Sequence, residues 1–157
     1  MKKKTPLLSR VIQFISLLIL FLIVLLRLEI IGQPMVNMSF RYSDKKLNKQ
    51  FKFEDRQPQI KYIDFENNTL RYLELVVDPE LPYVVFIHGA PGSLADYLDY
   101  FRDERVYNKL NLISIDRLGY GNSDFGRSET SIQKQGEAIQ SVIKKACKND
   151  KIILLGH

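Results

Sequence analysis

A turn that contains two glycines and a proline follows a run of five apolar residues. The run is Tyr83–Ile87 and the turn is His88-Gly89-Ala90-Pro91-Gly92-Ser93. An unbroken apolar run bounded by proline and glycine is typical of a strand buried on both faces. A strand, a tight turn and a helix leave backbone N–H groups free at the turn, where they attract an anion. The turn is therefore a candidate anion site.

The pattern of an apolar strand that runs into glycines returns twice. Leu112–Asp116 leads into Arg117–Asp124, with Gly119 and Gly121, and Ile152–Leu155 leads into Gly156-His157. Strands that alternate with helices at this spacing predict a parallel sheet with right-handed crossovers.

Two crossover helices are predicted between these strands. Apolar residues recur at helical spacing at Leu94, Tyr97, Leu98 and Phe101, and again in 131–147 at Ile132, Ile139, Val142, Ile143 and Ala146. Ser93 with Asp96 is a capping box for the first helix, and we expect Thr130 and Gln133 to cap the second.

Taken together, the three glycine-bearing segments resemble the α/β-hydrolases. His88–Gly92 looks like the HGxPG oxyanion turn of that family, and Asp116–Ser123 looks like its DxxGxGxS loop. Gly156-His157 looks like the first two residues of its G-x-S-x-G nucleophile elbow. The resemblance covers roughly residues 60–157. It implies an α/β fold, the N-terminal half of an α/β-hydrolase domain with a mostly parallel sheet and crossover helices.

The resemblance also implies where the chemistry lies. In this family one oxyanion donor is the backbone N–H of the residue after His-Gly, which is Ala90 here, and Ala speaks against the haloalkane dehalogenases, which usually place Asn there. The nucleophile is expected immediately after His157, and the second oxyanion donor just after the nucleophile. The remaining motif positions are expected to be structural: His88, Gly89, Pro91, Gly92, Asp116, Gly119, Gly121, Ser123, Gly156 and His157.

No residue of the chain is predicted to act as nucleophile, acid or base. His88 is interpreted as packing the turn, and His157 as supporting the elbow, which leaves no histidine for a base. Ser123 is interpreted as a loop-stabilising residue, and Asp116 with Arg117 as a hydrogen-bonded or ion-paired corner. No cofactor and no metal are predicted.

Three functions stay open. The first is a hydrolase of an ester, thioester or amide, with a Ser nucleophile past His157 and a small-molecule substrate. The second resembles an epoxide hydrolase with an Asp nucleophile, and the third is a non-catalytic, membrane-tethered module. We expect the chain as given to be an inactive N-terminal fragment, with strand 151–155 as an open, aggregation-prone edge.

Charge separates the N-terminal part from the rest. Residues 1–60 carry 11 Lys and Arg against 4 Asp and Glu, a net charge of +7, whereas residues 61–157 carry 12 against 14, a net charge of −2. The domain is therefore not expected to bind nucleic acid. The positive charge fits a tail beside a membrane.

The N-terminal segment predicts a membrane anchor. Residues 1–10 form a basic tail, and residues 11–31 form an apolar stretch of the length that spans a bilayer as one transmembrane helix. The lysines before it favour a cytoplasmic N-terminus with the domain on the outer side. The alternative is a cleaved signal peptide and a secreted or periplasmic protein.

Two segments connect the anchor to the first buried strand. Residues 32–59 read as a polar linker on lipid headgroups, with a short helix near 43–51 on which Leu47 and Phe51 share a face. Ile60–Phe65 and Leu70–Val77 read as a β-hairpin around Glu66–Thr69, in which Asn accommodates left-handed backbone angles. Cys147, the only cysteine, is expected to be a partly buried structural thiol.

Overall fold

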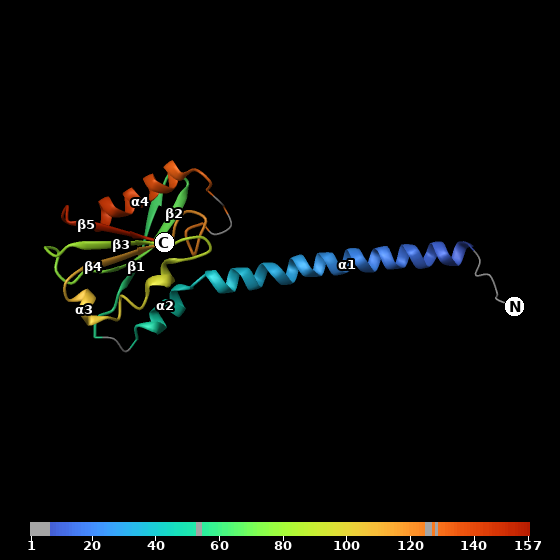
Figure 1. Cartoon of the computed structure of the whole chain (residues 1–157), viewed down its shortest axis with the longest axis horizontal. Coiled ribbons are helices and arrows are strands. Elements are labelled where there is room, and N and C mark those ends of the chain that lie inside the picture. Colours follow the sequence, from blue (N-terminus) through green and yellow to red (C-terminus); the bar gives the residue numbers. More distant parts are fainter. Residues whose placement is uncertain (1–6, 53–54, 125–126, 128) are drawn as a thin grey trace. The chain divides into compact units, whose positions relative to one another are not determined.

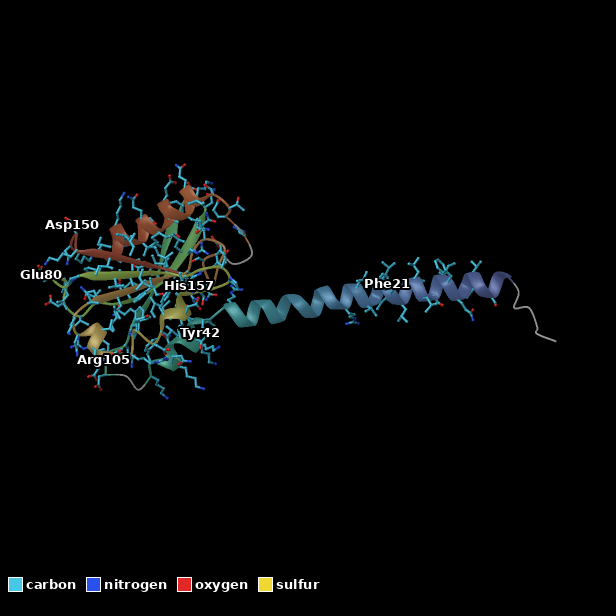
Figure 2. All side chains as sticks on the ribbon, in the orientation of Figure 1. Phe21, Tyr42, Glu80, Arg105, Asp150 and His157 are labelled. Atoms are coloured by element: carbon cyan, nitrogen blue, oxygen red, sulfur yellow. The ribbon has the colours of Figure 1, made fainter. Side chains whose placement is uncertain are left out.

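The computed structural model describes residues 7–52, 55–124, 127 and 129–157, and the chain forms two compact units, residues 1–39 and 40–157. The first unit consists almost entirely of one helix, α1 (Leu7–Phe40). Its side chains from Val11 to Leu25 are exposed, as the labelled Phe21 illustrates (Figure 2). Within the described part of the chain, no helix combines the length and the apolar content that a membrane crossing requires. The predicted basic tail lies mostly outside the described residues.

A five-stranded sheet forms the centre of the second unit (Figure 1). Its order is β1-β2-β4-β3-β5, with β1 at Gln59–Phe65, β2 at Asn68–Leu75, β3 at Tyr83–Ile87, β4 at Asn111–Ile115 and β5 at Ile152–Gly156. β3 pairs in parallel with β4 and β5, but β2 pairs antiparallel with both β1 and β4. The sheet is therefore mixed and not mostly parallel, because the hairpin contributes two antiparallel pairings.

Both strands of the predicted hairpin are present. The residue with left-handed backbone angles at its turn, however, is not an asparagine. Glu66 carries the positive φ of 52°, and Asn68 already belongs to β2. The structure thus gives the left-handed position to a residue type for which it is unusual.

Each face of the sheet has its own hydrophobic core. On one face, α2 (Asp44–Gln50), the 3₁₀ helix η1 (Leu94–Tyr97) and α3 (Glu104–Tyr107) lie over side chains that include Val84 and Phe86. On the other face, α4 (Ile132–Ala146) packs Ala138 and Val142 on side chains that include Val85. Figure 1 shows α4 on one side of the strands and α2 and α3 on the other. Burial on both faces explains why β3 and β4 lack polar alternation.

The first crossover is less helical than predicted. Leu94, Tyr97, Leu98 and Phe101 are all buried on the sheet as expected, but only a 3₁₀ helix of four residues forms at their start. The capping box of Ser93 and Asp96 is present. The chain then continues through turns to α3, which is capped by Asp103. Burial of the same side chains therefore does not require a continuous helix.

The second crossover helix, α4, is confirmed with two corrections. Its N-cap is Ser131, whose side chain accepts a hydrogen bond from the backbone N–H of Lys134, and not Thr130. Ile132 is 88% exposed because it is the first helical residue and lies beyond the edge of the core. Cys147 ends the helix and is partly buried, and burial raises the pKa of its thiol to about 11.

The segment predicted as a linker is largely structured. α1 continues to Phe40, and α2 begins after Ser43, which caps it through a hydrogen bond from the N–H of Lys46. Leu47 and Phe51 are buried in the core, as the shared face of the predicted short helix implies. α2 is thus part of the folded domain, and its lysines, Lys45, Lys46 and Lys49, are exposed.

Candidate functional site

The carboxyl end of β3 and the carboxyl end of β5 meet at the predicted oxyanion turn. The backbone N–H of His157 donates a hydrogen bond of 3.2 Å to the carbonyl of Ile87. A Cβ on Gly89 would lie only 3.0 Å from the carbonyl oxygen of His157 and 3.1 Å from its Nδ1. Gly89 thus lets the two segments approach closely. The structure brings together the turn and the two residues that resemble the start of an elbow.

His88 is buried inside the turn, and its ring nitrogens are both engaged. The N–H of Arg117 donates to Nε2 at 3.1 Å, so Nε2 is an acceptor and the proton of the neutral ring is on Nδ1. Nδ1 lies 2.7 Å from the carbonyl oxygen of Gly89, to which it donates. Burial, reinforced by the charge of Arg117, holds the pKa of His88 below its usual value. The ring of His88 is therefore neutral, and its two hydrogen bonds hold the backbone of the turn in place.

The far side of the turn is equally crowded. A Cβ on Gly92 would lie 2.6 Å from Oδ2 of Asp96 and 2.9 Å from Nδ1 of His88. Oδ2 of Asp96 accepts a hydrogen bond from the N–H of Ser93 at 3.1 Å, which closes the capping box. The Ala90–Pro91 peptide is cis. Contacts on the turn thus explain His88, Gly89 and Gly92 of the HGxPG pattern.

Asp116 is a fully buried carboxylate that connects the turn to the rest of the domain. Its Oδ1 accepts from the N–H of Leu94 at 2.7 Å, at the residue where η1 begins. Its Oδ2 accepts from Nε of Arg71 at 2.7 Å and from the N–H of Asn122 at 2.9 Å. Nη2 of the fully buried Arg71 lies 2.6 Å from the same oxygen. Three segments far apart in the sequence therefore converge on one side chain.

The loop after Asp116 wraps around that carboxylate. Gly121 has a φ of 53°, and a Cβ there would overlap the carboxylate of Asp116. Gly119 also has a positive φ, 80°, and its N–H donates to the carbonyl of Ser123 at 2.8 Å. The buried hydroxyl of Ser123 donates to the carbonyl of Asp116 at 2.7 Å and accepts from the N–H of Arg71 at 2.8 Å. These bonds give Ser123 a structural role, because its hydroxyl has no free hydrogen to donate to a substrate.

Arg71 is the residue of this site that sequence reasoning missed. Besides Asp116, its Nη1 donates to the carbonyl of Tyr42 at 2.6 Å and to Oδ1 of Asp44 at 2.9 Å. The signal in the sequence is a single arginine between apolar residues of a predicted strand. A buried arginine requires a carboxylate partner, but its position 45 residues further on follows only from the pairing of β2 with β4.

A small hollow lies beside the turn. It has a volume of about 320 Å³ and is lined by Gly89, Pro91, Asp96, Tyr97 and His157. A larger surface groove of about 560 Å³ is lined by residues of β1 and α4 and by none of the three motifs, so we assign the site to the smaller hollow. Among the described residues, no three His, Cys, Asp or Glu side chains are grouped in a way that would hold a metal ion.

Comparison with known proteins supports the resemblance. No protein-family profile matches the chain. A proline iminopeptidase of Saccharolobus solfataricus is 37% identical over 76 residues, which are 47% of this chain and 24% of that protein.

Solved structures agree with this result at the level of the fold. A membrane phospholipase A described as a bacterial virulence factor aligns with a TM-score of 0.56, 16% identity and coverage of 92% of this chain and 43% of its own. The epoxide hydrolase VrEH1 from Vigna radiata aligns with a TM-score of 0.53, 18% identity and coverage of 64% and 32%.

The sheet order, the three motifs and these similarities together support a relationship to the α/β-hydrolase superfamily, whose fold the second unit resembles. The chain spans about a quarter of the iminopeptidase and less than half of each of the two structures.

Proposed function

We propose that the protein is a membrane-anchored hydrolase that cleaves an ester, thioester or amide through a serine directly following His157. The observation that carries this proposal is the contact between the oxyanion turn and Gly156-His157. The carbonyl carbon of His157 lies 3.5 Å from the place of a Cβ on Gly89, so a residue joined to that carbon would start beside the turn. A nucleophile there would have the N–H of Ala90 close by to stabilise the tetrahedral oxyanion.

The 157-residue chain by itself is proposed to be inactive. His88 uses both ring nitrogens within the turn, and the hydroxyl of Ser123 is consumed by the Asp116 loop. Neither side chain is available as a base or nucleophile. Hydrolysis of p-nitrophenyl acetate by the purified chain, well above a heat-killed control, would contradict this part of the proposal.

A fluorophosphonate probe tests the nature of the nucleophile. The gene is first sequenced beyond the codon for His157, and the encoded protein is then purified and incubated with the probe. We expect Ser-x-Gly after His157 and labelling of that serine. An Asp at this position with no labelling would favour the epoxide-hydrolase alternative, for which the fold likeness to VrEH1 is the supporting observation. A stop codon there would favour the non-catalytic module.

Membrane anchoring is proposed from the N-terminal sequence. No described helix meets the requirement for a membrane crossing, but the apolar side chains of residues 11–25 are exposed along α1 and would contact lipid. We propose a cytoplasmic N-terminus with the domain on the outer side. Carbonate extraction of membranes and protease protection test both statements, and release of the protein by carbonate would contradict the anchor.

A further inference from the structure

The carbonyl oxygen of Gly89 is held from two directions. Nδ1 of His88 donates to it at 2.7 Å, and Nη2 of Arg117 donates to it at 2.9 Å. The second bond comes from a charged donor, and charge-assisted hydrogen bonds are stronger than neutral ones. The Gly89 carbonyl is thus more tightly constrained than an ordinary loop carbonyl.

The constraint on this carbonyl extends to the next N–H. The peptide that joins Gly89 and Ala90 is planar, and the cis peptide of the turn is the following one, Ala90–Pro91. In a trans peptide the C=O and N–H groups point in opposite directions. Two donors on the oxygen of Gly89 therefore also set the direction of the N–H of Ala90, away from Arg117 and His88.

The side chain of Arg117 is itself held in place. Its guanidinium carbon lies 4.6 Å from the centre of the Tyr120 ring, and Tyr120 packs edge-on against His88 at 5.2 Å. The backbone N–H of the same arginine is bonded to His88. A planar guanidinium that stacks on an aromatic face and donates from its edge has no equivalent in lysine.

We propose that Arg117 is a positioning residue of the oxyanion turn. It holds the carbonyl of Gly89 and thereby aims the N–H of Ala90 at the place where an oxyanion forms. This inference rests on the proposed function only for the use of that N–H, because the geometry of the turn exists without turnover. It assigns to the second residue of the DxxGxGxS-like loop a contact that links this loop to the HGxPG-like turn.

The test is nuclear magnetic resonance of the whole isotope-labelled chain in detergent micelles, with Arg117→Gln as the variant. We expect the ¹³C′ resonance of Gly89 to move upfield, because its carbonyl loses an acceptor bond. The amide ¹H–¹⁵N signal of Ala90 should also shift, because the peptide that carries this N–H is no longer held in one direction. We also expect the pKa of His88 to rise, because a neighbouring positive charge has been removed.

Two further variants keep the test decisive. Arg105→Gln is the matched control, since that side chain is 88% exposed and pairs with Asp103 away from the turn, and it should change none of the three signals. Arg117→Lys preserves the charge and should still shift the Gly89 carbonyl signal, and it replaces Arg117→Gln if the latter does not fold. An unchanged Gly89 carbonyl signal in the folded variant would overturn the proposal.

The outcome is separable from that of the proposed function. A shifted Gly89 signal with no fluorophosphonate labelling would leave the positioning role intact and reject the serine hydrolase. An unchanged signal with strong labelling of the serine would do the reverse.

Discussion

Two regions of the sheet differ sharply in how far their side chains are buried and hydrogen-bonded. Around the carboxyl ends of β4 and β3, the buried carboxylate of Asp116 accepts from Arg71, Leu94 and Asn122. Along β5, the apolar side chains of Ile153, Leu154 and Leu155 are 50%, 58% and 38% exposed. The first region is a buried, hydrogen-bonded cluster, and the second is an exposed edge strand.

The two regions correspond to two parts of the proposed chemistry, the oxyanion turn and the approach to the nucleophile. The residues around the HGxPG-like turn are bonded to one another, whereas β5 places Gly156 and His157 beside that turn and leaves its apolar side chains exposed. An exposed apolar edge strand offers unpaired N–H and C=O groups to any other strand. The described domain therefore combines a turn fixed by many hydrogen bonds with an exposed apolar edge at β5.

The largest expected effect comes from breaking the buried ion pair. Asp116→Asn keeps the shape of the side chain but leaves the buried guanidinium of Arg71 with only the partly exposed carboxylate of Asp44. We expect the free energy of unfolding in urea to fall by about 3 kcal/mol. Asp99→Asn, at a fully exposed carboxylate, is the control and should change it by less than about 0.5 kcal/mol. A loss below about 1 kcal/mol in Asp116→Asn would contradict the central role of the pair.

A glycine exchange probes the same scaffold through its backbone. Gly121→Ala places a methyl group on the Asp116 carboxylate at a φ of 53°, and we expect a loss of about 2 kcal/mol. Gly136→Ala, in the exposed interior of α4 with no atom near the new methyl group, should instead stabilise the protein by up to about 1 kcal/mol. The same Gly→Ala exchange should therefore lower the free energy of unfolding at one position and raise it at the other, as measured by urea unfolding.

The pH dependence of stability tests the neutral state of His88. Its pKa in the folded protein is below the ordinary value of about 6.5, so the unfolded chain binds a proton first as the pH falls. The contribution of His88 is complete above pH 6.5. It is lost at up to about 1.4 kcal/mol per pH unit between that value and the folded pKa. Urea unfolding at pH 5–8 should show this slope, and His88→Gln should lack it. Equal slopes in the two proteins would contradict the assignment.

The smallest effect on stability is expected at the open edge. Leu154→Lys replaces a side chain that is 58% exposed, so the free energy of unfolding should change by less than about 0.5 kcal/mol. Self-association should nevertheless decrease, because a charge on an edge strand opposes pairing with another strand. Sedimentation velocity in a fixed detergent measures this change. Unfolding of the variant would show that Leu154 is covered in solution.

Short-range patterns predicted several parts of the structure well. Strand β3 has the predicted bounds Tyr83–Ile87, because an apolar run between Pro82 and a glycine turn has few other conformations. The capping box of Ser93 and Asp96 also formed as predicted, because its bonds join residues no more than three apart. In residues 94–101 the apolar periodicity correctly predicted which side chains are buried. It wrongly predicted one continuous helix.

Contacts between distant segments could not be read from the sequence. The partner of Arg71 lies 45 residues away, and the bond from Arg117 to the carbonyl of Gly89 spans 28 residues. Both depend on which strands pair and in which register, and neither has a local sequence signal. The residue types of the turn and its loop were thus visible in the chain itself. Their arrangement into one bonded cluster came from the packing of β2, β3 and β4, because a buried polar group takes whichever partner the fold brings to it.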